Sequence, residues 1–134
     1  MKNSTKILVV LILIVMAVSF TSSVFSRDKG RVINEAVKFG EYHADYKAPF
    51  VVNEQKKLIL DVEAKLESGE FTLWIISPDN ESVYEKKGNS FKQHVILDVR
   101  KGTWYYRIKC SGGNNGDKLI AAKNGSYTIQ GTLE

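Results

Sequence analysis

The stretch KLILDVEAKLESG, residues 57–69, has the clearest residue pattern in the chain. Apolar side chains recur at every second position, and mostly charged residues lie between them; the apolar set is Leu58, Leu60, Val62, Ala64 and Leu66. Successive side chains of a β-strand point to opposite faces, whereas a helix repeats its apolar positions about every 3.6 residues. The stretch therefore predicts a strand with one buried face.

The same alternation continues through most of the chain. It places these side chains on apolar faces: Phe71, Leu73 and Ile75; Phe91, Val95, Leu97 and Val99; Trp104, Tyr106, Ile108 and Cys110; Tyr127, Ile129 and Leu133. Weaker strand candidates are residues 32–39, 41–46, 50–52 and 82–85, SPDN at 77–80 favours a turn, and residues 111–125 are expected to form a long loop. About seven or eight short strands predict an all-β, antiparallel, jelly-roll-like β-sandwich.

The segment TWYYRIKC, residues 103–110, contains the only cysteine of the chain. The phase of the strand places Cys110 on its apolar face, so we expect a buried thiol and not a reactive nucleophile. If this strand forms a hairpin with the preceding one across Lys101 and Gly102, then Val99 pairs with Trp104 and Ile96 opposes Arg107. In a jelly roll, strands that are neighbours in sequence can instead lie in opposite sheets. In that case the same residues point inward, but their cross-strand partners are different.

The N-terminus has the residue order of an export signal. Lys2 and Lys6 precede 12 uninterrupted apolar residues at 7–18, and a Ser/Thr-rich stretch follows. A transmembrane helix needs about 20 apolar residues, so length favours a signal peptide that is cleaved before Arg27. A retained anchor helix is the alternative, since residues 7–25 are long enough to span a membrane if they are read as one stretch. We therefore expect residues 1–26 to be a signal peptide or signal anchor and residues 27–134 to be a single β-sandwich domain.

Charge and motif content exclude several classes of function. Without residues 1–26, 17 basic residues face 15 acidic ones, which gives no concentrated basic face for a nucleic acid. The sequence contains no Gly-x-Ser-x-Gly, His-Glu-x-x-His or Cys-x-x-Cys motif and no phosphate-binding glycine loop. We therefore predict a protein that is not an enzyme, with no catalytic residue, metal site or cofactor. Contact with a membrane is expected only through the N-terminal segment, if it is uncleaved.

The order VILDVRKGTWYYRIKCSGG at 95–113, followed by GSYTIQG at 125–131, resembles the closing strands of the bacterial pre-peptidase C-terminal domain. Upstream, KLILDVEAKLESGEFTLWIISPDNESVY at 57–84 is similar to that family's pair of strands ending in a Pro-Asp-Asn type turn. The resemblance covers residues 54–131. It implies a jelly-roll-like sandwich that accompanies exported hydrolases as a non-catalytic appendage and that stabilises, targets or binds.

One surface departs from the apolar-in, polar-out pattern. Trp74 and Ile76 lie opposite the core positions of their strand, and in the hairpin register Ile96 and Tyr105 join them with basic residues at the border. The predicted binding strip is Trp74, Ile76, Ile96, Tyr105, Arg107 and Lys109. The alternative is that a loop or the N-terminal segment covers these residues, or that Trp74 lies in the core.

The function expected from these features is that of a non-catalytic binding or accessory module at the outer cell surface or envelope, secreted or N-terminally membrane-anchored. Its expected partner is a cell-envelope polymer or an exported protein. A structural or assembly subunit of an envelope or secretion complex is the alternative, and a small hydrolytic enzyme is a more distant one.

Overall fold

The computed structural model describes residues 30–115 and 118–134. In these residues ten strands form two four-stranded antiparallel sheets and a two-stranded ribbon. Sheet A has the spatial order β1 (Arg31–Tyr42), β10 (Ala122–Leu133), β3 (Lys56–Ser68) and β6 (Ser90–Val99). Sheet B has the order β2 (Ala44–Val52), β7 (Gly102–Ser111), β4 (Glu70–Ile76) and β5 (Ser82–Gly88). The ribbon pairs β8 (Gly113–Asn115) with β9 (Lys118–Ile120).

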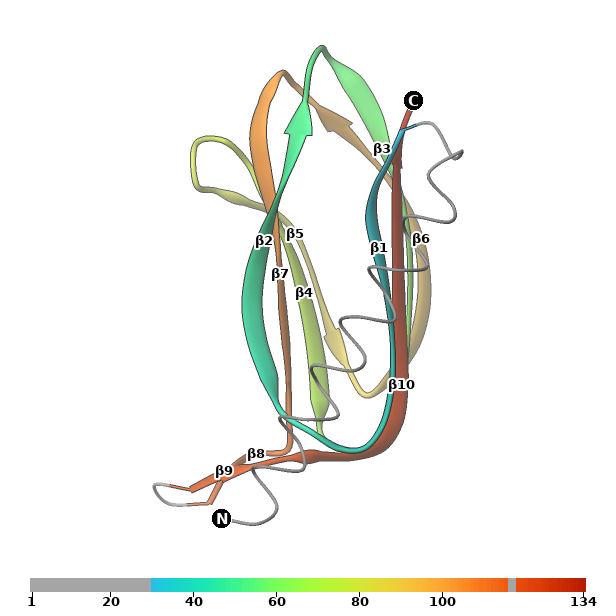
Figure 1. The fold of residues 1–134 in the computed structure, drawn as a ribbon, viewed down its shortest axis with the longest axis vertical. Helices are drawn as coiled ribbons and strands as arrows, with labels where there is room; N and C mark the ends of the chain where they lie inside the picture. Colours follow the sequence, from blue (N-terminus) through green and yellow to red (C-terminus); the bar gives the residue numbers. More distant parts are fainter. Residues whose placement is uncertain (1–29, 116–117) are drawn as a thin grey trace.

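The two sheets face one another as layers, with sheet B on the left and sheet A on the right of Figure 1. Apart from the β4–β5 hairpin, each connection within the sandwich joins a strand of one sheet to a strand of the other, and the connection from β7 to β10 contains the ribbon. The order β1-β10-β3-β6 against β2-β7-β4-β5 is that of an eight-stranded jelly roll. The predicted antiparallel β-sandwich is therefore confirmed. The predicted signal peptide or anchor helix lies outside the described residues, and the part of the chain that is described contains no helix long and apolar enough to span a membrane.

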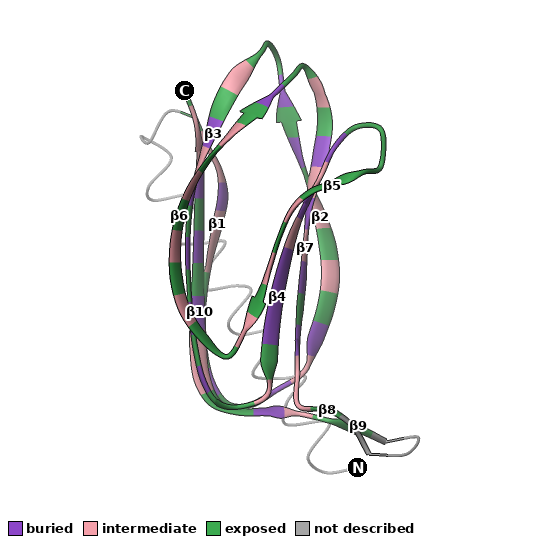
Figure 2. Cartoon of the chain, turned by 180° about the vertical axis from the view of Figure 1, so that it is seen from behind, coloured by how far each residue is buried: buried purple, intermediate pink, exposed green. Residues whose placement is uncertain are grey.

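The core lies between the sheets, where the inward side chains of both meet. Alternation of buried and exposed residues is visible along most strands in Figure 2. Every predicted inward residue of β3, β4 and β7 is buried, and several side chains, among them Leu58, Phe71 and Cys110, have no exposed surface. Along β6 only Val99 is fully buried, and its other inward side chains are half-buried. The predicted faces are thus correct on all five of the clearest strands, including β10.

The predicted hairpin between β6 and β7 is wrong. β6 pairs with β3 in sheet A, where Leu97 lies opposite Leu58, and β7 pairs with β2 and β4 in sheet B. Val99 and Trp104 both remain buried, but they belong to different sheets. The chain crosses between the sheets just before Gly102, whose φ of +147° belongs to a region that L-residues rarely adopt. The alternative in which sequence neighbours lie in opposite sheets is the correct one.

Two segments that the sequence analysis left outside the strands contain strand residues. The break expected between residues 46 and 50 does not occur, because β2 continues through Pro49. Proline lacks the N–H group that would donate to a neighbouring strand. It is tolerated in β2 because β2 is an edge strand of sheet B and has a neighbour on only one side. The loop expected at 111–125 contains the β8–β9 ribbon and the first residues of β10. β8 consists of Gly and Asn, and β9 has only three residues, so neither shows a strand pattern in the sequence.

Candidate functional site

Alternate side chains of sheet B point away from the core, and Trp74 lies at the centre of this outer face. Its cross-strand neighbours are Glu85 on β5 and Arg107 on β7. The Arg107 guanidinium lies 4.8 Å from the centre of the Trp74 ring, and the indole Nε1 donates a hydrogen bond to Glu85. Cation–π contact and this hydrogen bond hold the half-buried indole against the sheet.

Arg107 is itself held by β2. Its Nε and Nη2 atoms donate to the two carboxylate oxygens of Asp45, both at 2.9 Å. This bidentate pair lowers the pKa of Asp45 and raises the pKa of Arg107. Both groups are therefore charged at neutral pH, and Asp45 is unsuited to proton transfer near that pH. Trp74, Arg107 and Asp45 form an ordered line across three strands.

Beside this line the outer face contains a groove of about 730 Å³. Thr72 lies at its base and is only 4% exposed, with Lys87 and Lys109 as its neighbours on the adjacent strands. The lining residues are His43, Asp45, Gly69, Glu70, Thr72, Trp74, Lys87, Lys109, Ser111, Gly112, Gly113 and Leu119. The groove thus combines an indole, an aliphatic side chain of the ribbon, a hydroxyl and charges of both signs.

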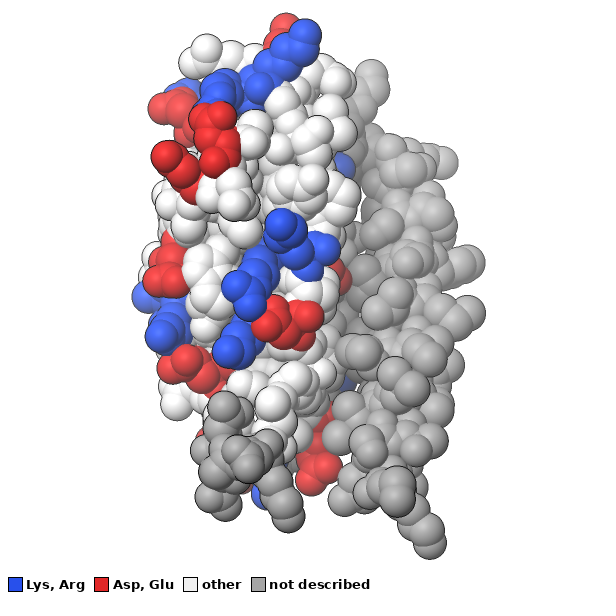
Figure 3. Space-filling view, turned by 90° about the vertical axis from the view of Figure 1, so that its left-hand side faces the viewer, with Lys and Arg blue, Asp and Glu red and all other residues white. Residues whose placement is uncertain are grey.

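Figure 3 looks directly onto this face of sheet B. Lys and Arg side chains gather in a line over its middle, acidic side chains lie on both sides of the line, and an uncharged strip separates the line from the charges at the far edge. Among the residues that the structure describes, no three His, Cys, Asp or Glu side chains are grouped as a metal ion would require. The face therefore offers mixed charges around an uncharged strip.

The structure brings five of the six predicted strip residues together on this outer face: Trp74, Ile76, Tyr105, Arg107 and Lys109. Tyr105 lies opposite Ile76, and the Lys47 ammonium lies 4.6 Å from the centre of its ring. Ile96 does not belong to this surface. It lies on the outer face of sheet A opposite Ile59 and is 56% exposed. Its placement with Arg107 depended on the incorrect β6–β7 hairpin.

Sequence reasoning missed Asp45, Thr72 and Glu85 as members of the site. Asp45 and Glu85 come from strands that were predicted only weakly, and Arg107, which Asp45 contacts on β7, is distant from it in sequence. Thr72 could have been found, because it shares the outward phase of Trp74. The part of the groove contributed by the ribbon had no signal in the sequence.

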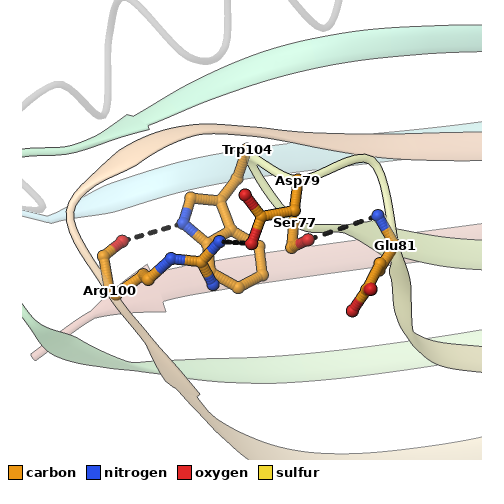
Figure 4. Close-up of polar contacts among 5 residues, drawn as sticks. All are labelled: Ser77, Asp79, Glu81, Arg100 and Trp104. Atoms are coloured by element: carbon orange, nitrogen blue, oxygen red, sulfur yellow. Dashed lines mark hydrogen bonds and ion pairs between the residues drawn. The ribbon is translucent and has the colours of Figure 1, made fainter.

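A separate polar cluster lies at the other end of sheet B, between the β4–β5 loop and the start of β7 (Figure 4). Arg100 forms an ion pair with Asp79 and lies 6.0 Å from the centre of the Trp104 ring. The Trp104 indole donates to the Arg100 carbonyl at 2.9 Å, and a Cβ at Gly102 would lie 2.6 Å from Pro78. The predicted SPDN turn therefore packs tightly on the crossing between the sheets, and this cluster is structural.

The interior also contains a carboxyl group that the sequence analysis did not single out. Glu35 lies on β1 in the phase of the buried Ile33 and Val37. It accepts hydrogen bonds from the hydroxyls of Tyr46 and Tyr106, each at 3.0 Å. Burial raises the pKa of Glu35 above its usual value, although these hydrogen bonds act in the opposite direction. The sequence did contain a sign of this burial, because Glu35 is a charged residue among the apolar inward positions of β1.

This raised pKa predicts that Glu35 destabilises the folded protein at neutral pH. Because the folded state binds the proton more tightly than the unfolded state, its contribution is fully present below the usual pKa of 4.5 and is lost as the pH rises through the folded-state pKa. Glu35→Gln should therefore raise the free energy of unfolding relative to wild type at pH 7.5. The advantage should shrink toward pH 4. Urea denaturation at both pH values measures it, and an equal effect at both would contradict the assignment.

The comparisons with known proteins concern the fold. No protein-family model matches the chain, and no curated protein matches its sequence. A solved structure with the same architecture is the pre-peptidase C-terminal domain of a collagenase from Bacillus anthracis, with a TM-score of 0.51 and 14% identity over 77% of this chain and 89% of that one. The chain thus has a fold like that of the pre-peptidase C-terminal domain. This confirms the fold that the sequence resemblance implied.

Two further solved structures are similar at lower TM-scores. A periplasmic inhibitor of g-type lysozyme from Aeromonas hydrophila has a TM-score of 0.47 and 8% identity, over 78% of this chain and 88% of that one. A carbohydrate-binding module from a Cellvibrio mixtus lichenase, solved with cellotriose, has a TM-score of 0.42 and 8% identity, over 79% and 92% of the two chains.

Proposed function

We propose that this chain is a non-catalytic binding module that holds a polymer or a protein partner in the groove on the outer face of sheet B. The observation that carries the proposal is the groove itself, in which Trp74 is held in place by Arg107 and Glu85 beside the buried Thr72. An aromatic side chain that is already fixed loses little conformational freedom on binding. Lys109 and Glu70 at its border supply polar contacts that select the ligand.

The chemistry of the nearby groups supports binding over catalysis. Asp45 is held ionised by Arg107 and lacks the pKa near neutrality that a general acid or base needs. Cys110 has no exposed surface, and burial raises the pKa of its thiol to about 12. A nucleophilic cysteine requires the opposite, an accessible thiol with a lowered pKa.

The proposal includes a location outside the cytoplasm. Residues 1–26 have the order of an export signal, so we place the module at the outer cell surface, secreted or anchored by that segment. The expected ligand is then a polymer of the cell envelope or an exported protein.

Trp74→Ala is expected to weaken binding by about 1–3 kcal/mol, the usual range for truncating an important interface aromatic. The melting temperature should change little, because Trp74 is half-exposed on the outer face. Capture of envelope polymer and of envelope proteins by the immobilised full chain distinguishes the two ligand classes. A folded Trp74→Ala variant that captures as much as wild type would refute binding at the groove.

Val51→Ala is the matched control. It also removes an exposed apolar side chain from the outer face of sheet B, but Val51 lies opposite Thr103, outside the groove. We expect unchanged capture by this variant. Charge reversal at Lys109 should weaken capture less than Trp74→Ala and should depend on salt, as is usual for exposed charges at the border of an interface.

A further inference from the structure

β6 is an edge strand with ten residues, and it has β3 as its only neighbour among the described strands. Along an edge, alternate backbone N–H and C=O groups point away from the sheet and can pair with another strand. By comparison, β2 carries Pro49, which lacks an N–H group. β6 contains no proline along its whole length.

The side chains of β6 leave apolar surface uncovered on both faces. Phe91, Val95 and Leu97 point toward the core but are only half-buried. On the outer face Ile96 is 56% exposed and lies opposite Ile59 of β3. A strand placed against this edge would remove apolar surface from water on both faces of the sheet, which favours association.

The charges of β6 are self-complementary in one antiparallel register. If two copies meet at a twofold axis through Val95, Lys92 of each copy lies opposite Asp98 of the other, and His94 lies opposite Ile96. Within one copy Lys92 lies opposite Glu63, and Lys57 donates to Asp98 at 2.7 Å. The four side chains that lie side by side across the joined sheet form one row: Lys57 and Asp98 of one copy, then Lys92 and Glu63 of the second copy. The charges alternate in sign along each of the two rows.

Neighbouring registers lose this complementarity. An axis through His94 places Lys92 beside Ile96 of the second copy, and an axis through Ile96 places Lys92 beside the like-charged Arg100. A shift by one residue would turn the two sandwiches to opposite sides of the joined sheet, because successive side chains alternate between faces. Opposite charges directly across a pair of strands stabilise it, and like charges destabilise it.

We propose that two copies of this chain associate through antiparallel pairing of β6 with β6 about Val95, which makes sheet A continuous across the dimer. This register keeps the two sheets B on the same side of the joined sheet. Both copies of the groove then face the same way, and a polymer or a clustered partner can bind both at once. Linked binding of this kind raises overall affinity without any new contact.

Two charge reversals test the register. Each of the full-length variants Lys92→Glu and Asp98→Lys places like charges opposite one another in both rows of its own dimer, so each should lose at least tenfold in self-association. A mixture of the two variants restores opposite charges in both rows and should associate as wild type does. Co-capture of differently tagged chains in one mild detergent, with light scattering for the mass, measures this.

The control is Lys65→Glu, an equal charge reversal on an exposed residue of β3 that lies opposite Ser90, outside the paired stretch. It should associate as wild type does, and thermal melts should show that all variants are folded. Monomeric wild type, unchanged self-association of either β6 variant, or a mixture that fails to associate would each overturn the proposal.

Disulfide formation tests the same pairing independently of association through other parts of the chain. Chains with His94→Cys should cross-link to chains with Ile96→Cys, because these residues are directly opposite one another in the proposed register. Chains with His94→Cys and Asp98→Cys should not, since they are displaced by two residues. The buried Cys110 stays out of reach. Equal cross-linking of both pairs would exclude this register.

Discussion

Trp104→Ala is expected to lower the free energy of unfolding by about 3–5 kcal/mol, the usual cost of removing a buried tryptophan. Trp104 is 2% exposed and packs against Phe50, with 6.4 Å between the ring centres. Its Nε1 donates to the Arg100 carbonyl at the crossing between the sheets, and the Arg100 side chain reaches past it to Asp79 (Figure 4). The substitution leaves a large cavity and an unpaired carbonyl in the same place.

Trp74→Ala is the matched control for this prediction, because it removes the same side chain from the outer face of sheet B. Its stability should fall by about 1 kcal/mol or less, because loss of the half-exposed indole breaks its contacts with Arg107 and Glu85 but leaves no cavity in the core. Urea denaturation followed by circular dichroism compares the two variants. Similar losses for both would show that burial does not distinguish the two tryptophans and would contradict the sandwich as described.

Cys110→Lys is expected to prevent folding of the domain. Cys110 has no exposed surface and lies between its cross-strand neighbours Ala44 and Phe71. An ammonium group at this place would have no water, and burying an unpaired charge costs several kcal/mol, which is comparable with the total stability of a small domain. Cys110→Ala removes only a small buried group and should cost about 1 kcal/mol. Circular dichroism and urea denaturation measure both.

Thiol labelling tests the same burial without disrupting the core. The wild-type thiol should react slowly with a maleimide or disulfide reagent in the native state and rapidly in urea. Its pKa is raised to about 12 by burial, so little thiolate is present at neutral pH. The control is Cys110→Ala with Lys109→Cys, which moves the thiol to the exposed face of the same strand and should label at once. Fast labelling of native wild type would contradict the inward position of Cys110.

Much of this fold could be predicted from alternation alone. In β3, β4 and β7 the apolar phase identified every inward residue, because a strand sends successive side chains to opposite faces whatever its neighbours are. The outward position of Trp74 followed from the same rule. β2 was harder, since Pro49 reads as a break until the strand is known to lie at an edge.

The pairing of strands could not be predicted in the same way. β7 lies between β2 and β4, and these neighbours depend on contacts between residues that are far apart in the chain. For that reason the predicted strip mixed Ile96 of sheet A with residues of sheet B, while Asp45, which holds Arg107, was missed. A short connection such as the one between Val99 and Gly102 permits either a hairpin or a crossing, and packing decides between them.

Residue alternation alone thus accounts for an all-β sandwich, the inward side chains of its main strands and the outward position of Trp74. Each of these depends on the direction of a side chain relative to its own strand, which is a local property. The assembled sheets are needed to know the strand order, the groove between β4 and the ribbon, and the burial of Glu35 beside Tyr46 and Tyr106. These depend on which strands meet, and that choice is made when two apolar faces of the whole chain close on one another.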